Sequence, residues 1–147
     1  MTMTLTKWCE NGWLRRHQTS REEISDLLGI ADRDLADAGS TISADWRFGI
    51  AYNAALKLCT ILLYAEGYQP EKTLQHYRTI MALPMILGPQ RKKDADYLNA
   101  CRAKRNLVEY DRVGGVTDQD ADELIGFVRE LKQEVLLWLR EKHSSLV

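Results

Sequence analysis

The sequence predicts an all-α protein, folded as an antiparallel up-and-down bundle of four to five helices. Apolar residues recur at spacings of three and four through most of the chain, which is the periodicity of an amphipathic helix. Capping residues precede the periodic segments, glycine or proline follows them, and patterns typical of strands are nearly absent. With 147 residues, 45% of them hydrophobic and 28% charged, the chain has the size and composition of one globular domain.

We expect three parts along the chain. Residues 1–19 form an N-terminal extension, residues 20–142 form the helical bundle, and residues 143–147 form a C-terminal tail. The extension carries Trp8 and Trp13, which either pack on the bundle or contribute to a dimer interface, where aromatic side chains are enriched. We favour packing within the chain.

The caps mark the first two helices of the bundle. A helix over 20–38 begins with Ser20 and Glu23, spaced as a capping box, and Gly39 suits its end. A second helix, over 43–66, is apolar on most of its faces, so we expect it at the centre of the bundle. The apolar face of the first helix consists of Ile24, Leu28, Ala31, Leu35 and Ala38.

Proline and glycine separate the remaining helices. Pro70 suits the first turn of a third helix, which Pro84 kinks or ends. A fourth helix runs from about Gln90 to Tyr110, and Thr117 caps the last helix. The apolar seam of that last helix consists of Leu124, Val128, Leu131, Val135 and Trp138.

Composition excludes several classes of function. A net charge of −1 argues against a polycation that coats nucleic acid. The three cysteines (Cys9, Cys59 and Cys101) lie at no metal-ligand spacing, so we expect free thiols in a cytoplasmic protein without metal or cofactor. The N-terminus has no signal-like apolar run, and the most apolar stretch, residues 54–65, is too short to span a bilayer, so we expect no membrane partner.

Charge is distributed unevenly along the chain. Residues 20–45 carry a net charge of −5, and residues 90–112 carry a net charge of +3. The basic segment is either a solvated surface with ion pairs or a local patch for a phosphate or an RNA backbone. Its polar side chains near the end of the fourth predicted helix are Arg102, Lys104, Arg105, Asn106, Glu109 and Tyr110. A guanidinium, an amide and a phenol within two turns suit a phosphate, unless they only join the helix to its neighbours.

Three blocks of the sequence resemble the HEPN superfamily in order and approximate spacing, over about residues 20–140. The blocks are Asp45-Trp-Arg-Phe-Gly-Ile-Ala-Tyr52-Asn53-Ala-Ala-Leu, then Gly67-Tyr68 followed by His76, then Arg105-Asn106-x-x-x-Tyr110-Asp111. The resemblance implies a helical bundle that forms a homodimer, with two late-helix motifs in one cleft. It also implies a toxin–antitoxin or defence-system component, often encoded beside a nucleotidyltransferase that acts as antitoxin.

Superfamily members that act as metal-independent RNases carry an Arg, a polar residue and then a His. Arg105 and Asn106 match the first two positions, but Tyr110 stands where the His is expected. Histidine is suited to take the proton of a 2′-hydroxyl, whereas tyrosine, with a pKa near 10, is a poor base at neutral pH. His76 reaches this cleft from the third helix or lies hydrogen-bonded at the surface, and Glu109 is a second candidate base.

We therefore expect a dimeric protein that binds RNA or a nucleotide. Its phosphate-binding residues are Arg102, Lys104, Arg105 and His76, and its candidate catalytic residues are Arg105, Asn106 and Tyr110. The alternative is a metal-independent endoribonuclease toxin that uses the Arg105-Asn106 cleft with a displaced base. A third reading is a partner that only neutralises or scaffolds a nucleotidyltransferase.

Overall fold

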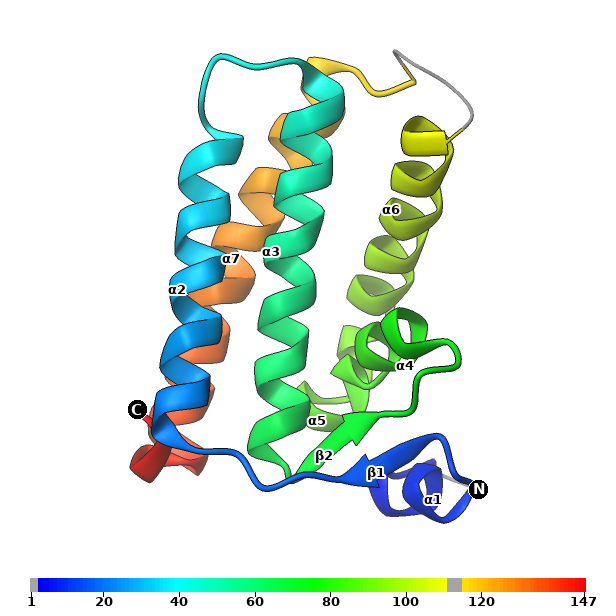
Figure 1. The fold of residues 1–147 in the computed structure, drawn as a ribbon, viewed down its shortest axis with the longest axis vertical. Coiled ribbons are helices and arrows are strands. Elements are labelled where there is room, and N and C mark those ends of the chain that lie inside the picture. The colour runs from blue at the N-terminus through cyan, green and yellow to red at the C-terminus, as the bar shows by residue number, and fades with distance from the viewer. Residues whose placement is uncertain (1–2, 111–114) are drawn as a thin grey trace.

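The computed structural model describes residues 3–110 and 115–147, with the side chains of 107–110 outside that description. It confirms the all-α antiparallel bundle, because four long helices run alternately up and down (Figure 1). These are α2 (Arg21–Ala38), α3 (Ala44–Ala65), α6 (Lys92–Tyr110) and α7 (Asp118–Lys142). The shorter elements are α1 (Leu5–Glu10), β1 (Leu14–Arg16), β2 (Tyr68–Pro70), α4 (Gln75–Met81), α5 (Leu83–Leu87) and the 3₁₀ turns Pro89–Arg91 and Ser144–Leu146.

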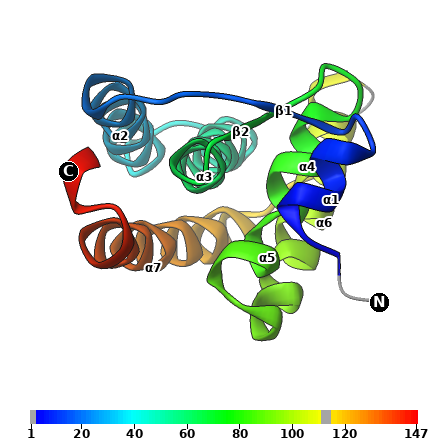
Figure 2. The same cartoon turned by 90° about the horizontal axis from the view of Figure 1, so that it is seen from below.

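Helix α3 is central, as its apolar composition predicts. It packs most extensively against α2 and α7, and α4 and α6 cover its third side (Figure 2). By length and hydropathy α3 could cross a membrane, but 67% of that segment is buried inside the bundle, which fits the core helix of a soluble protein. The apolar stretch that the sequence analysis found too short to span a bilayer, residues 54–65, is only the second half of this helix.

One stripe of α3 stays partly accessible, on the side opposite α7. Between residues 48 and 64, the residues that are not fully buried are Gly49, Ile50, Asn53, Lys57, Thr60 and Tyr64. The exposed Trp46 continues this series toward the start of the helix. Apart from the adjacent pair Gly49 and Ile50, these positions are spaced by three and four, so they lie above one another along the helix. We call this series the open stripe of α3.

Most helix boundaries lie where the sequence predicts them, with Ser20 and Thr117 as caps, and Ser43, predicted as the start of the second helix, also acts as a cap. Ser43 and Thr117 accept hydrogen bonds from backbone N–H groups of α3 and α7, and Thr117 forms a full capping box with Asp120. The capping box predicted at Ser20 is only half formed. Ser20 accepts from the Glu23 N–H, but the Glu23 carboxylate binds Thr19 and His17 instead, both at 2.7 Å.

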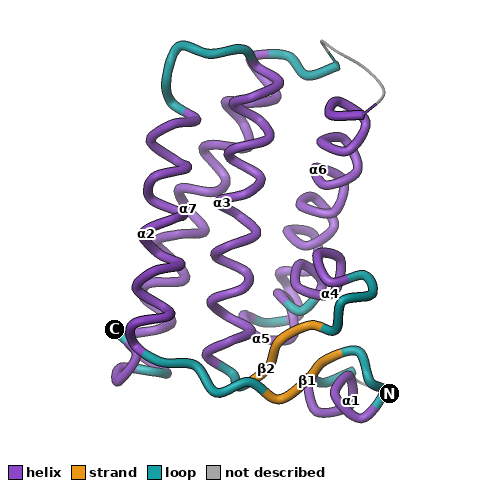
Figure 3. Tube along the Cα trace, in the orientation of Figure 1, coloured by secondary structure: helices purple, strands orange, loops and turns teal. Residues whose placement is uncertain are grey.

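One prediction of local structure is wrong. Pro70 does not begin a helix, because it ends β2, which pairs antiparallel with β1 in a two-stranded sheet (Figure 3). The strands are three residues each, too short for an alternating pattern to show in the sequence. The predicted seam of α7 packs in the core, where Leu124, Val128, Leu131 and Val135 are buried and Trp138 is half-buried against them. Leu139 is also buried.

Residues 5–16 pack on the lower end of the bundle, as Figure 3 shows. Trp8 is 7% exposed and belongs to a small second core with Leu14, Leu63 and Tyr68. The Arg78 guanidinium carbon lies 3.9 Å from the centre of the Trp13 ring. Both tryptophans therefore pack within the chain, as favoured from the sequence.

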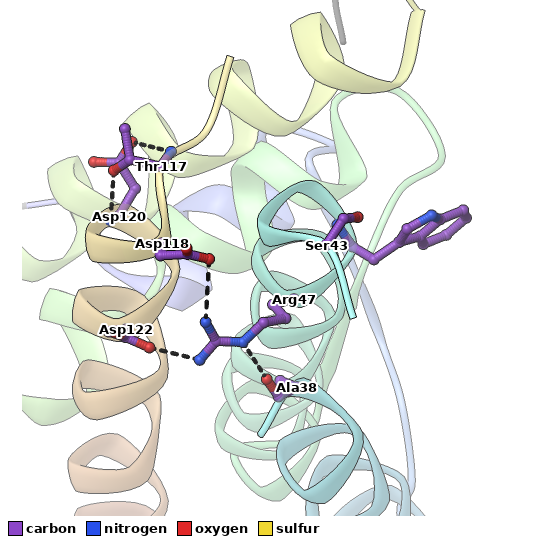
Figure 4. Close-up of polar contacts among 8 residues, drawn as sticks. Ala38, Ser43, Arg47, Thr117, Asp118, Asp120 and Asp122 are labelled. Atoms are coloured by element: carbon purple, nitrogen blue, oxygen red, sulfur yellow. Dashed lines mark hydrogen bonds and ion pairs between the residues drawn. The ribbon is translucent and has the colours of Figure 1, made fainter. Parts of the chain in front are cut away.

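Arg47 joins three elements at the upper end of the bundle (Figure 4). Its Nε donates to the carbonyl oxygen of Ala38, the last residue of α2, at 2.8 Å. Its terminal nitrogens lie 2.5 Å from an oxygen of Asp122 and 3.7 Å from one of Asp118, both in α7. The Arg47 side chain is only 16% exposed, so these contacts are partly shielded from water.

We expect Arg47→Met to destabilise the fold by about 1–3 kcal/mol, because it removes charge-assisted hydrogen bonds and keeps the apolar stem. Urea unfolding followed by circular dichroism measures this difference. Arg140→Met, at an exposed position of α7, is the matched control and should cost less than about 0.5 kcal/mol. Equal stability of the two variants would contradict the role given to Arg47.

Candidate functional site

Arg105 extends from α6 toward α3. Its guanidinium carbon lies 5.4 Å from the centre of the Tyr52 ring, within the range of a cation–π contact. A Cβ atom at Gly49 would stand 3.9 Å from the Arg105 Nε, which is ordinary contact distance. A side chain longer than alanine at position 49 would therefore enter the space that Arg105 occupies.

Arg102 and His76 lie beside Arg105. The Nε of Arg102 donates to Asn99 Oδ1 at 3.0 Å, and its guanidinium carbon lies 6.0 Å from the ring of Tyr77, so α6 and α4 meet here. His76 is the neighbour of Tyr77 on α4 and is exposed. Lys57, on the open stripe of α3, supplies a further cation.

The pKa of His76 reflects this neighbourhood. Partial removal of its ring from water is the largest cause that lowers the pKa below 6.5, and the charges of Arg105, Lys57 and Arg102 follow in that order. The three cations act on one imidazole, although they come from two helices. We call Lys57, Arg102, Arg105 and His76 the cationic cluster.

Tyr52 forms the buried wall next to this cluster. It is 1% exposed, and burial raises its pKa to about 12, while the charges of Arg102 and Arg105 act in the opposite direction. Its hydroxyl makes no hydrogen bond within the described part of the chain. An unsatisfied buried hydroxyl costs free energy, and such groups are uncommon outside functional or strained sites.

The backbone just before His76 is strained. Leu74, which precedes the first residue of α4, has φ 56° and ψ 32°, the left-handed conformation that a leucine rarely adopts. Its side chain is 57% exposed and gains little from burial there. Strain of this kind clusters at functional sites, and here it sets where α4 begins and so where His76 stands.

The other candidates from the sequence do not join the cluster. Lys104 pairs with Asp120 of α7, with Nζ and Oδ2 2.8 Å apart, and this contact lowers the pKa of Asp120 to about 2. Asn106 is exposed on α6. The side chains of Tyr110 and Glu109 lie outside the described residues, so their roles stay predictions.

Lys57 was not among the residues singled out from the sequence. Its signal was a lone charge inside the most apolar stretch of the sequence, residues 54–65. A charged side chain is almost never fully buried, so it marks the one side of a central helix that reaches water. That reasoning places Lys57 on the open stripe but does not reveal that His76 lies beside it.

Metal chemistry has no visible basis in the described residues. They contain no group of three or more His, Cys, Asp or Glu side chains that could hold a metal ion. Cys59 and Cys101 are buried, and burial raises their pKa values, to about 12 and about 11. These two thiols are therefore protonated and unreactive at neutral pH.

The cluster has the chemistry of an anion site. Guanidinium groups bind phosphate through paired N–H donors, and a lysine adds a point charge. A phosphate among these cations would also raise the pKa of His76 toward its ordinary value, because an anion favours the charged imidazole.

We expect the pKa of His76 to lie below 6.5 and to rise in Arg105→Ala, because that variant removes the charge with the largest repelling effect. Proton NMR of the imidazole resonances across pH 5 to 8 measures both values. Lys93→Ala, at an exposed position of α6, should leave the pKa unchanged. A His76 pKa at its ordinary value, or equal pKa shifts in both variants, would contradict the arrangement of the cationic cluster.

Comparisons with protein-family models, curated proteins and solved structures find no match to this chain. The resemblance noted from the sequence therefore depends on its three residue blocks alone.

Proposed function

We propose that this chain binds RNA or a nucleotide through phosphate, in the cationic cluster of Lys57, Arg102, Arg105 and His76. The observation that carries the proposal is the convergence of these side chains from α3, α4 and α6. Like charges do not gather around one imidazole to stabilise a fold, because each disfavours the next. Their position beside the accessible stripe of α3 gives an anion a route to them.

The wider proposal follows the resemblance of the three blocks to the HEPN superfamily. We place the chain in the cytoplasm as a homodimer, in a toxin–antitoxin or defence system with a nucleotidyltransferase. Helix α6 supports a role in pairing, because Ala100, Ala103 and Asn106 of this helix are exposed and leave part of its surface uncovered by the described residues.

Binding to a single-stranded RNA should weaken as salt rises. The slope of log K against log salt should be roughly −2, because each of three phosphate contacts contributes about −0.7. Arg105→Ala should lower the affinity and reduce the slope to roughly −1.4, since one contact is lost. Fluorescence anisotropy with a labelled RNA over a salt series measures both.

Lys93→Ala is the matched control for this experiment. It removes one positive charge from the same helix at an exposed position outside the cluster. It should leave the slope near that of the wild type. No binding, or equal losses in the two variants, would refute the proposed function.

A second candidate is metal-independent RNA cleavage, with His76 as the general base. The observation that favours it is the place of the exposed His76 on α4, beside Tyr77, which the Arg102 guanidinium contacts. An imidazole at or below its ordinary pKa is mainly neutral at pH 7 and can accept the 2′-hydroxyl proton. Arg105 would hold the neighbouring phosphate and stabilise the charge that develops on it.

Cleavage of an RNA pool in EDTA tests this second function. The wild type should cleave the RNA, and the cleavage rate should fall at least about a hundredfold in both His76→Ala and Arg105→Ala. The rate should fall as pH drops through the pKa of His76, because protonation removes the base. A wild type without activity, or a fully active His76→Ala, would leave binding as the function.

A further inference from the structure

We propose that the ligand is a single strand of nucleic acid lying along the open stripe of α3, with one base stacked on the indole of Trp46. This inference rests on the proposed function and extends it, because it names the form of the ligand and its base-contacting residue.

Trp46 is the most exposed of the large apolar side chains that the structure describes, at 68%. It stands at the end of a helix whose other aromatic residues in the first three turns, Phe48 and Tyr52, are 3% and 1% exposed. Leaving a tryptophan in water forgoes the free energy of its burial, about 1.5–3 kcal/mol for a large apolar side chain. The fold gains nothing from this exposure, whereas a stacking surface requires it.

The position of Trp46 relative to Arg105 supports the proposal. Gly49 lies three residues after Trp46, so the two occupy neighbouring turns of one helix face. Arg105 approaches α3 at Gly49, where a Cβ atom would lie 3.9 Å from the Arg105 Nε. Arg105 therefore reaches α3 within one helical turn of Trp46, at the upper part of the stripe.

The spacing along the stripe favours a strand over a mononucleotide. Trp46 and Lys57 are eleven residues apart, which is roughly 16 Å along the helix axis. Arg105 approaches α3 between these two residues, and His76 lies near Lys57. One aromatic face followed by cations at two heights matches a base and the successive phosphates that follow it.

The charge and the shape of this surface together favour a single strand as the ligand. The cations call for a polyanion, and the exposed ring calls for a flat apolar group attached to it. Duplex RNA offers its phosphates but keeps its bases stacked inside, so it cannot cover the indole. A single strand offers both.

The experiment measures the Kd of a labelled uridine oligoribonucleotide by fluorescence anisotropy. Trp46→Ala should raise the Kd by about 5- to 150-fold, the range expected for one lost stacking contact, and Trp46→Phe should recover part of it. Leu137→Ala is the control, since Leu137 is 63% exposed on α7 and lies outside the stripe. It should leave the Kd unchanged.

An abasic strand of the same length separates base from phosphate. It should bind the wild type about as weakly as the uridine strand binds Trp46→Ala, and it should not distinguish Trp46→Ala from the wild type. If uridine monophosphate binds as tightly as the oligomer, the ligand is a mononucleotide and the proposal of a single-stranded ligand is refuted.

The two proposals fail in different ways. If Arg105→Ala weakens binding and Trp46→Ala does not, the stacking role is wrong and phosphate binding stands. If neither variant weakens binding, both are wrong.

Discussion

Burial of α3 is the constraint on which the rest of the structure depends. This helix is apolar on nearly every side, so it is stable in water only when other elements surround it. Helices α2 and α7 cover two sides, and α4 and α6 cover a third (Figure 2). What remains is one narrow stripe, which includes Trp46, Asn53 and Lys57. The other two aromatic residues in the first three turns of α3, Phe48 and Tyr52, are buried.

The other helices are fixed to α3 and to each other by a few polar contacts at their ends. Arg47 holds α2 and α7 at the upper end, and Asn53 donates to the buried Asp34 of α2 at 2.7 Å. Lys104–Asp120 links α6 to α7 at 2.8 Å, and Arg91–Glu134 links the 3₁₀ turn before α6 to α7 at 2.5 Å. Arg102 and Arg105 lie on other sides of α6 than Lys104, and they stand beside His76 of α4.

Helix periodicity and caps were sufficient to predict most of the fold. The positions of α2, α3, α6 and α7, and the central place of α3, follow from spacing and from Ser20, Ser43 and Thr117. The two short strands were missed because their pairing depends on the return of residues 68–70 to residues 14–16, a contact distant in sequence. The half-formed capping box at Ser20 was missed because Glu23 has a stronger partner in His17, which only the fold brings near.

The candidate site was predictable in its residues but not in its geometry. Arg102, Arg105 and His76 were singled out from the sequence, and they lie in one cluster. Lys104 was grouped with them because residues on one helix look equivalent in sequence, yet its contact with Asp120 joins it to α7. The exposure of Trp46 could not be foreseen, because tryptophan in an apolar helix is usually buried.

The central claim is that a nucleic-acid strand binds where the open stripe of α3 meets the cationic cluster. The most direct test is an NMR titration of the isotope-labelled protein with a short single-stranded RNA, following the backbone amides. The account predicts that the largest shifts fall on residues 46–57, 75–77 and 102–106, with α7 beyond its first turns little changed. Shifts concentrated on α7 or on residues 21–38, or no shifts at all, would contradict it.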